Sequence, residues 1–406
     1  MQTNNAKRRY IPELLTLHCE ELEFLWGQRR LALHSPRYFL RDFLHLTERI
    51  EAHLQGLLAV PDALPDLLLP QLAEADEQDR VFALVCPLLR LQNPVLTAQL
   101  VEFFTQSTLK TGAGFRDAFS FAPAGLYIHE LQRILRQEAI LPAVYAITAL
   151  ANLRALERNN DVLQSFLFHS DALVAKLAWQ ASLTVDCLPA TMSSPPRPYQ
   201  QTLVRPEASL REIALKSALW TRQAWILPTL RQMTLAGDIT ALQWLAIVTQ
   251  GEEGALIVDK LALVADLSKR CEIVTRFGHP ALLPLLQNWA TGDDVLLGSY
   301  AGAAFTRITG VDVRGERVPM PVAQTADEFE RDFAPLIWTT DVSKMKSYLA
   351  QCSYHLQQAN RWSRGVCLDG VLRAESLAEI DLQIRWDQAA RHRLVGNISN
   401  PPEPIF

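Results

Sequence analysis

The side chains of this chain that could hold a metal ion are its nine histidines and six cysteines, and their spacing does not favour such a site. A zinc site needs three or four ligands that converge on one point, and neither HExxH nor CxxC occurs. His45 and His53 lie too far apart for neighbouring helical turns. His18 and Cys19 are adjacent, so they point to different faces of a helix. We therefore expect no metal site and no cofactor.

Two further patterns resemble nucleotide-binding or catalytic motifs but differ from them in detail. In the segment TLKTGAGF, Lys110 precedes Gly112 and Gly114, whereas a phosphate-binding loop carries its lysine after the last glycine. His279 lies between a glycine typical of a helix end and a proline typical of a helix start, which predicts a turn. No GxSxG nucleophile motif occurs. The sequence predicts no catalytic residue, and we expect the chain not to be an enzyme.

Tryptophan and arginine are enriched at the energetic centre of protein interfaces. Most of the nine tryptophans are expected to pack in the core or between repeats. Trp220 and Trp225 differ, because they flank Arg222 at an expected turn between two helices. We therefore select Trp220, Arg222 and Trp225 as candidate partner-binding residues.

The elements that would position these side chains are helices that recur between about residue 126 and residue 313. Small residues occupy comparable places in four of them: Ala178, Ala214, Ala246 and Ala301. Their successive separations are 36, 32 and 55 residues, and the last is about two repeats. Such periods are typical of stacked helical hairpins, and a small residue lets paired helices approach closely. The recurring segments are AILPAVYAITALANL, ALVAKLAWQASL, SLREIALKSAL, DITALQWLAIV, PALLPLLQNW and LLGSYAGAAFTRI.

This pattern predicts an all-α fold, a HEAT-like α-solenoid of stacked helical hairpins with specialised helical regions at both ends. Five prolines between 188 and 206 exclude a continuous helix, and we expect a surface loop there, with a polyproline docking segment as the alternative. Runs of alternating β-branched residues, the sign of a strand, are not found. The predicted regions are a helical N-terminal region at 1–106, an irregular connection at 107–125, repeats at 126–313 interrupted by the proline-rich loop at 188–206, a helical C-terminal region at 314–395 and a flexible tail at 396–406.

Composition and charge narrow the choice of partner. The net charge of −5 and the pI of about 6.0 give no overall attraction to nucleic acid or to an anionic membrane. No segment has the length and hydropathy of a membrane span, and the N-terminus lacks the features of a secretory signal. The scattered cysteines are typical of free, buried thiols in a reducing compartment. We expect a cytoplasmic protein that does not insert into a membrane and binds neither nucleic acid nor a small-molecule substrate.

Three segments carry a family resemblance. In chain order they are EELEFLWGQRRLALHSPRYFLRDFLHLTERIEAHLQGL, then the pair RFGHPALLPLL and AGAAFTRITGVDV, then RGVCLDGVLRAESLAEIDLQIRWDQAARHRL. Together they resemble a family of HEAT-like repeat proteins commonly encoded in bacterial type VI secretion gene clusters. The resemblance implies a cytoplasmic accessory protein of a secretion locus, and it transfers no catalytic mechanism.

The first of these segments carries a helical face of its own. Leu22, Leu25, Trp26 and Arg29 recur at three- and four-residue spacing. This face is expected either to cap the apolar end of the repeat array or to dock a partner. Trp26 and Arg29 therefore join the candidate partner-binding residues.

Together these observations favour a non-enzymatic protein–protein interaction scaffold or adaptor. The expected partner is a protein of the secretion system, either an effector or the machinery that loads it. An immunity protein that neutralises a cognate effector is the first alternative, because it would have the same fold. An enzyme or a DNA-binding HEAT-like protein is the second. A DNA-binding groove would need clustered basic residues, whereas the arginines of the repeats are dispersed.

Overall fold

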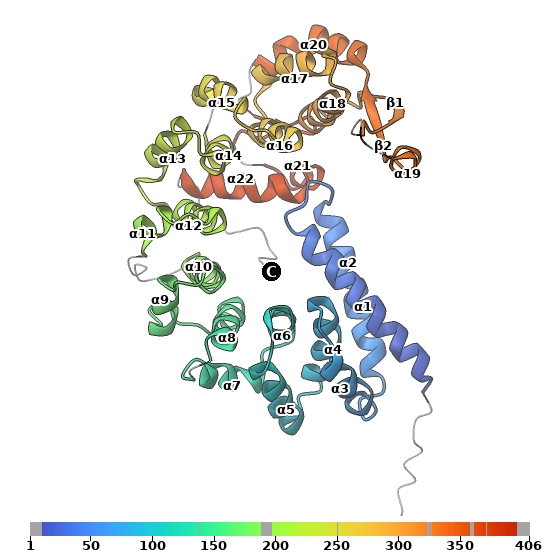
Figure 1. Ribbon diagram of the computed structural model, residues 1–406, viewed down its shortest axis with the longest axis vertical. Coiled ribbons are helices and arrows are strands. Elements are labelled where there is room, and N and C mark those ends of the chain that lie inside the picture. Colours follow the sequence, from blue (N-terminus) through green and yellow to red (C-terminus); the bar gives the residue numbers. More distant parts are fainter. Residues whose placement is uncertain are drawn as a thin grey trace, which may run out of the picture. The chain divides into compact units, whose positions relative to one another are not determined.

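The chain is mostly helical, which confirms the all-α prediction (Figure 1). It forms two compact units, the first ending at Thr221 and the second beginning at Arg222. None of the described helices is long and apolar enough to cross a membrane. The computed structural model describes residues 10–137, 139–187, 197–249, 251–322, 325, 327–357, 361–370 and 372–395.

The helices of the first unit are α1 (Pro12–Ala32), α2 (Leu40–Leu58), α3 (Leu64–Glu74), α4 (Gln78–Arg90), α5 (Pro94–Thr105), α6 (Leu109–Phe121), α7 (Tyr127–Ile134), α8 (Ile140–Asn152), α9 (Asp161–Leu167), α10 (Ala172–Asp186), α11 (Tyr199–Leu203) and α12 (Ala208–Trp220). The even-numbered helices from α4 to α12 pack against one another in succession, and we call them the inner helices of this unit. The odd-numbered helices from α3 to α11 flank them.

The inner helices are buried on nearly every side, because other helices pack around them. In α8 every residue from Pro142 to Ala151 is buried, and four of these ten residues are alanines. The predicted small residues Ala178 and Ala214 lie in α10 and α12 without exposed surface. In this unit the recurring alanines therefore do lie in the inner helices.

The predicted irregular connection at 107–125 is wrong, because α6 occupies most of it as an inner helix. An added Cβ at Gly112 would lie 2.7 Å from the ring of Tyr145 in α8. At Gly114 it would collide with the backbone oxygen of Gln78 in α4. The glycines that suggest a flexible loop in the sequence therefore allow α6 to lie close to two neighbouring helices.

The predicted proline-rich surface loop at 188–206 is wrong over part of its length. Residues 188–196 lie outside the described residues, but α11 follows as a short helix packed against α12. Arg197 donates two hydrogen bonds of 2.9 Å to the carboxylate of Asp186, and both side chains are buried. Pro198 does not prevent α11, because it occupies the N-cap, where no helical N–H is needed.

The elements of the second unit are α13 (Ile226–Leu235), α14 (Ile239–Val248), η1 (Gly251–Glu253), α15 (Gly254–Leu261), α16 (Leu267–Phe277), η2 (Pro280–Leu282), α17 (Leu283–Thr291), α18 (Val295–Thr309), β1 (Arg314–Pro319), α19 (Glu328–Asp332), β2 (Leu336–Thr340), α20 (Val342–Gln357), β3 (Trp362–Ser363), β4 (Val366–Cys367), α21 (Ala374–Glu379) and α22 (Leu382–Leu394). Its inner helices are α14, α16 and α18, which pack in succession. Ala246 of α14 and Ala301 of α18 have no exposed surface. The 55-residue separation of these alanines spans two repeats because α16 lies between them.

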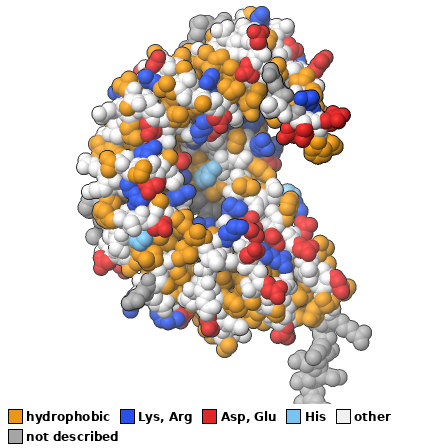
Figure 2. Space-filling model, viewed as in Figure 1, with side chains coloured by type: hydrophobic (Ala, Val, Ile, Leu, Met, Phe, Trp, Pro, Cys, Tyr) orange, Lys and Arg blue, Asp and Glu red, His pale blue; other side chains and the backbone are white. Residues whose placement is uncertain are grey.

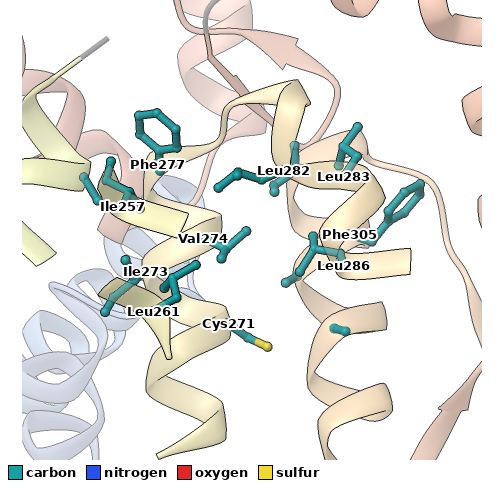
Figure 3. Packing of buried hydrophobic residues seen from close by; sticks show 14 of the residues in the cluster. Ile257, Leu261, Cys271, Ile273, Val274, Phe277, Leu282, Leu283, Leu286 and Phe305 are labelled. Atoms are coloured by element: carbon teal, nitrogen blue, oxygen red, sulfur yellow. The ribbon is translucent and has the colours of Figure 1, made fainter. Parts of the chain in front are cut away.

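An apolar core joins α15, α16, α17 and α18 (Figure 3). In Figure 3, Cys271 and Val274 of α16 and Leu286 of α17 point into the space between their helices. Cys271 is a free thiol, and burial raises its pKa to about 12, so it stays protonated. Four of the scattered cysteines are buried free thiols, as predicted: Cys19, Cys86, Cys187 and Cys271.

The C-terminal region predicted as helical at 314–395 also contains two small antiparallel sheets, so this prediction is wrong in part. β1 pairs with β2, and β3 pairs with β4. Charged residues fill three of the six positions of β1, and glycine and proline fill two more. This strand therefore lacks the alternation from which strands are predicted. The predicted flexible tail at 396–406 lies outside the described residues.

A buried arginine side chain supplies hydrogen bonds to the carbonyl groups at the C-terminal end of α14. Arg361 is 2 % exposed, and its guanidinium donates hydrogen bonds to the carbonyl oxygens of Ala246 and Ile247 in the last turn of α14. The last carbonyls of a helix have no partner within the helix, and a cation there complements the helix dipole. Burial lowers the pKa of Arg361 to about 9, so the side chain stays charged at pH 7.

The residues after this arginine donate hydrogen bonds from backbone N–H groups to the carbonyl groups at the C-terminal ends of the other two inner helices. The N–H of Trp362 donates to the carbonyl of Gly278 at the end of α16, at 2.8 Å. The N–H of Gly365 donates to the carbonyl of Ile308 in the last turn of α18, at 3.0 Å. Gly278 has a φ of 61°, and an added Cβ would lie 2.5 Å from the backbone oxygen of Trp362. Residues 361–365 thus hold α14, α16 and α18 together, and we call them the clamp.

Ion pairs attach α22 to the same inner helices. Arg276 of α16 donates two hydrogen bonds, of 2.7 and 2.5 Å, to the carboxylate of Asp387 in α22. Arg307 of α18 donates to Asp381, the N-cap of α22, at 3.0 Å. Both carboxylates are buried, so removal of Arg276 would leave the charge of Asp387 without this ion pair, whereas Asp381 also lies 3.5 Å from Arg364.

Replacing Gly114 with alanine should lower the free energy of unfolding of the first unit by about 1–3 kcal/mol. Alanine favours a helix more than glycine does, but its Cβ would overlap a backbone oxygen of α4 that cannot move away. Urea unfolding followed by circular dichroism measures the change. Gly292→Ala is the control, because its Cβ would lie in ordinary contact, 3.5 Å from the nearest atom. Equal losses in the two variants would contradict this packing.

Replacing Arg361 with methionine should destabilise the second unit by about 2–5 kcal/mol, because two buried carbonyls of α14 would lose their donor. Hydrogen exchange should be faster in the last turn of α14 and in the hairpin of β3 and β4. Arg373→Met is the control, since Arg373 is exposed. Unchanged exchange in α14 would show that the clamp does not close this helix.

Candidate protein-binding surface

The structure places Trp26 and Arg29, two of the predicted partner-binding residues, inside the first unit. Trp26 is 1 % exposed. Its ring stacks on Phe82 with 3.7 Å between ring centroids, and its Nε1 donates to Asp117 at 3.1 Å. The guanidinium of Arg29 is also buried and lies over Phe43, 4.5 Å from the ring centroid. Both side chains join helices within the core, so a partner cannot touch them in this structure.

The other predicted group, Trp220, Arg222 and Trp225, is exposed only in part. Trp220 belongs to the first unit and is buried in α12. Arg222 begins the second unit and is exposed, with a left-handed φ of 58°. Trp225 is half-buried at the N-cap of α13. Arg222 and Trp225 therefore stay predicted partner-binding residues, whereas Trp220 is a core residue.

The histidines form no metal-binding cluster in the part of the chain that the structure describes. His18 of α1 and His53 of α2 lie together, with their Nδ1 atoms 2.9 Å apart. Burial lowers the pKa of His53, which favours the neutral imidazole that such a hydrogen bond requires. His279 lies in the predicted turn and accepts a hydrogen bond from the backbone N–H of Ala281. Among the described residues, no three histidine, cysteine or acidic side chains are grouped as metal ligands.

Exposed aromatic side chains are grouped in the second unit, in residues 312–341, which we call the projection. It contains β1, α19 and β2, and no residue of α19 is buried. Figure 2 shows hydrophobic and acidic side chains together at the tip on the right, where Figure 1 places α19. The exposed large apolar side chains of the projection include Phe329 (67 % exposed), Phe333 (71 %), Leu336 (59 %), Val322 (38 %) and Trp338 (37 %).

The projection is attached to α18 through β2. The hydroxyl of Thr340 donates to the carbonyl oxygen of Gly298 in α18 at 2.7 Å. At Gly302, one turn further along α18, an added Cβ would collide with the same threonine side chain. In the strand pair, Val318 of β1 lies opposite Ile337 of β2. Small residues in α18 therefore make room for β2, and β2 positions the rest of the projection.

Two arginines lie over the ring of Trp338. The guanidinium carbon of Arg317 is 4.6 Å from the ring centroid, and that of Arg314 is 5.3 Å away. Asp312 orients Arg314 by accepting hydrogen bonds from its Nε at 2.9 Å and its Nη2 at 2.6 Å. The same guanidinium lowers the pKa of Asp312 to about 2, because it stabilises the carboxylate. A partly exposed tryptophan with two arginines over its ring has the composition of an interface centre.

Phe329 and Phe333 form a second aromatic group at the tip of the projection. Their ring centroids are 4.4 Å apart, with 31° between the ring planes. Asp327 and Glu330 form a capping box that fixes the start of α19. The backbone N–H of Glu330 donates to Asp327 at 2.7 Å, and the backbone N–H of Asp327 donates to Glu330 at 3.2 Å. The two rings are therefore held next to each other while most of their surface remains exposed.

Sequence reasoning did not select the aromatic residues of the projection, although the sequence contains a signal for them. Phe329 and Phe333 are four residues apart in an acidic segment between Pro321 and Pro335. Prolines this close together exclude a long helix that could bury both rings. Large apolar residues in a short, acidic segment bounded by prolines indicate an exposed aromatic surface.

Comparisons with protein-family models, with curated proteins and with solved structures gave no significant match. The fold and the projection define the chain as a helical protein with an exposed aromatic surface. Function must therefore be inferred from that surface and from the sequence.

The carboxyl group of Asp312 should titrate near pH 2 in the native protein and at a higher pH in the Arg314→Gln variant, which keeps only the backbone hydrogen bond from residue 314. The guanidinium favours the ionised carboxylate, so its removal raises the pKa. Any stability from this pair is present above the pKa of the unfolded chain and is lost as the pH falls toward 2. NMR of the carboxyl carbon measures the titration, with Arg373→Gln as the control. A midpoint that Arg314→Gln leaves unchanged would contradict the pairing.

Proposed function

We propose that this chain is a non-enzymatic interaction scaffold, an accessory protein of a type VI secretion system that binds an effector or the machinery that loads it. The observation that carries the proposal is the projection, with exposed Phe329, Phe333 and Leu336 next to the arginine-stacked Trp338. Clusters of exposed apolar and aromatic side chains are typical of protein-binding surfaces.

The packing order of the helices supports a HEAT-like α-solenoid as the framework. In each unit the inner helices pack in succession, with flanking helices between consecutive inner ones along the chain. A repeat of this kind contacts mainly its neighbours, so its outer surface can vary without loss of the fold. The projection interrupts this repeating order between α18 and α20 and is thus the kind of insertion that gives a scaffold its specificity.

The segments that carry the family resemblance have structural roles that fit this proposal. The carbonyl of Gly278, in the segment RFGHPALLPLL, accepts a hydrogen bond from the clamp, and the segment that begins RGVCLDG supplies the last two clamp residues, Arg364 and Gly365. Gly302, in AGAAFTRITGVDV, leaves the space that β2 of the projection occupies. The shared segments would then build the framework, and the side chains of the projection would select the partner.

The exposed side chains can supply the binding free energy that such a complex needs. Burial of a phenylalanine or leucine side chain contributes about 1.5–3 kcal/mol. Phe329, Phe333 and Leu336 together could contribute roughly 5–9 kcal/mol before the costs of association. Micromolar affinity corresponds to about 8 kcal/mol, so further contacts around Trp338 would complete a specific complex.

The double variant Phe329→Ala, Phe333→Ala should lose at least about tenfold in capture of a secretion-system component or effector by the tagged full-length chain in its native host. Affinity purification with quantitative mass spectrometry measures the capture. The variant should keep its unfolding midpoint, because α19 buries no residue.

Phe168→Ala is the matched control, since Phe168 is equally exposed in the first unit. It should capture the partner as the unmodified chain does. Capture that is unchanged in the double variant, or that recovers no secretion component or effector from any form, would contradict the proposed function.

A further inference from the structure

We infer that the protein partner offers an apolar pocket bordered by lysine and arginine side chains, and that Phe329 and Phe333 enter this pocket together. The inference rests on the proposed function and adds the chemistry of the partner to it. The observation behind it is the charge around the two rings rather than the rings alone. Acidic side chains surround an aromatic pair that is exposed at the tip of the projection.

The aromatic pair is already in a conformation that suits insertion. Phe329 and Phe333 contact each other with 4.4 Å between ring centroids, so they can enter one pocket as a single unit. The capping box of Asp327 and Glu330 fixes the helical turn that carries them. A turn that is ordered before binding loses less conformational entropy in the complex. Because both rings are mostly exposed, a pocket would remove more of their surface from water than a flat surface would.

The charge around the pair has one dominant sign. Four carboxylates and one guanidinium occur between 327 and 332, and all of these residues are exposed. No ion pair to Glu328 or Asp332 occurs among the described residues. Carboxylates at the rim of an interface favour a partner surface of positive potential, and they oppose an acidic one. The acidic rim therefore disfavours nucleic acid, an anionic membrane and the same tip of a second copy of this chain.

The two ends of the projection differ in charge, which would orient the partner. On the β1–β2 side, Arg314 and Arg317 lie over Trp338 and are balanced by Asp312 and Glu316, whereas α19 carries a net negative charge. A partner that placed its basic rim on the β1–β2 side would gain little electrostatic attraction, because the charges there balance. The orientation with the basic rim around Phe329 and Phe333 brings more opposite charges together.

The test combines charge reversal with photo-crosslinking in the full-length chain. Phe333 is replaced with p-benzoylphenylalanine, the chain is expressed in its native host, and the crosslinked residue of the partner is located by mass spectrometry. The charge-reversal variant is Glu328→Lys, Asp332→Lys, since Glu328 and Asp332 lie outside the capping box. The matched control is Glu375→Lys, Glu379→Lys, because these exposed residues have the same four-residue spacing on the short helix α21.

We expect one crosslinked protein, with the attachment point in an apolar pocket that has lysine or arginine side chains at its border. Charge reversal on α19 should reduce the crosslinked product about tenfold at 0.15 M salt, and the α21 control should leave it unchanged. Higher salt should weaken crosslinking of the chain with its natural acidic residues and should not weaken it further after charge reversal.

Three results would overturn the inference, and the first leaves the proposed function intact. If Phe329→Ala, Phe333→Ala abolishes capture while charge reversal on α19 has no effect, the pocket lacks a basic border. A crosslink to nucleic acid, lipid or a second copy of this chain would assign the surface to another occupant. An equal loss in the α21 control would show a general effect of net charge rather than a local one.

Discussion

The carbonyl groups at the C-terminal ends of α14, α16 and α18 need hydrogen-bond partners, and the organisation of the second unit depends on how the clamp supplies them. The side chain of Arg361 donates to α14, and the backbone N–H groups of Trp362, Arg364 and Gly365 donate to α16 and α18. A buried carbonyl without a partner costs about 1–3 kcal/mol. The C-terminal ends of all three helices must therefore lie within hydrogen-bond distance of the clamp. This requirement explains the left-handed glycines Gly278 and Gly310, where a side chain would collide with the clamp.

The same constraint leads to the projection. α18 ends next to the clamp, with Gly310 as its C-cap. The chain therefore leaves the inner helices at a defined residue and enters β1 at Arg314. The pairing of β2 with β1, and its contact with α18 through Thr340, then fix the base of the projection. A rigid base with an exposed tip suits recognition, because the apolar side chains are presented without a large loss of conformational entropy on binding.

Inner helices that are strongly apolar could be predicted from the sequence. Two less apolar ones, α6 and α16, could not be recognised in the same way. α8, α10, α12, α14 and α18 are apolar enough to be found from sequence. α16 was not among the recurring apolar segments, although a helix end was predicted at Gly278, because Arg276 and Glu272 bind α22 through polar groups and interrupt the apolar run. α6 was missed because glycine suggests a loop when its close helix neighbours are unknown. For the site, residue type alone could not separate Trp26, which is buried, from Trp338, which is partly exposed, since that difference arises from contacts between distant segments.

We propose that the protein binds its partner at the projection rather than along its helices. Hydrogen–deuterium exchange of the purified complex, compared with the free chain, tests this most directly. We expect new protection between 327 and 340, with exchange in the inner helices of both units unchanged. Protection confined to other helices, with residues 327 to 340 exchanging as in the free chain, would contradict it.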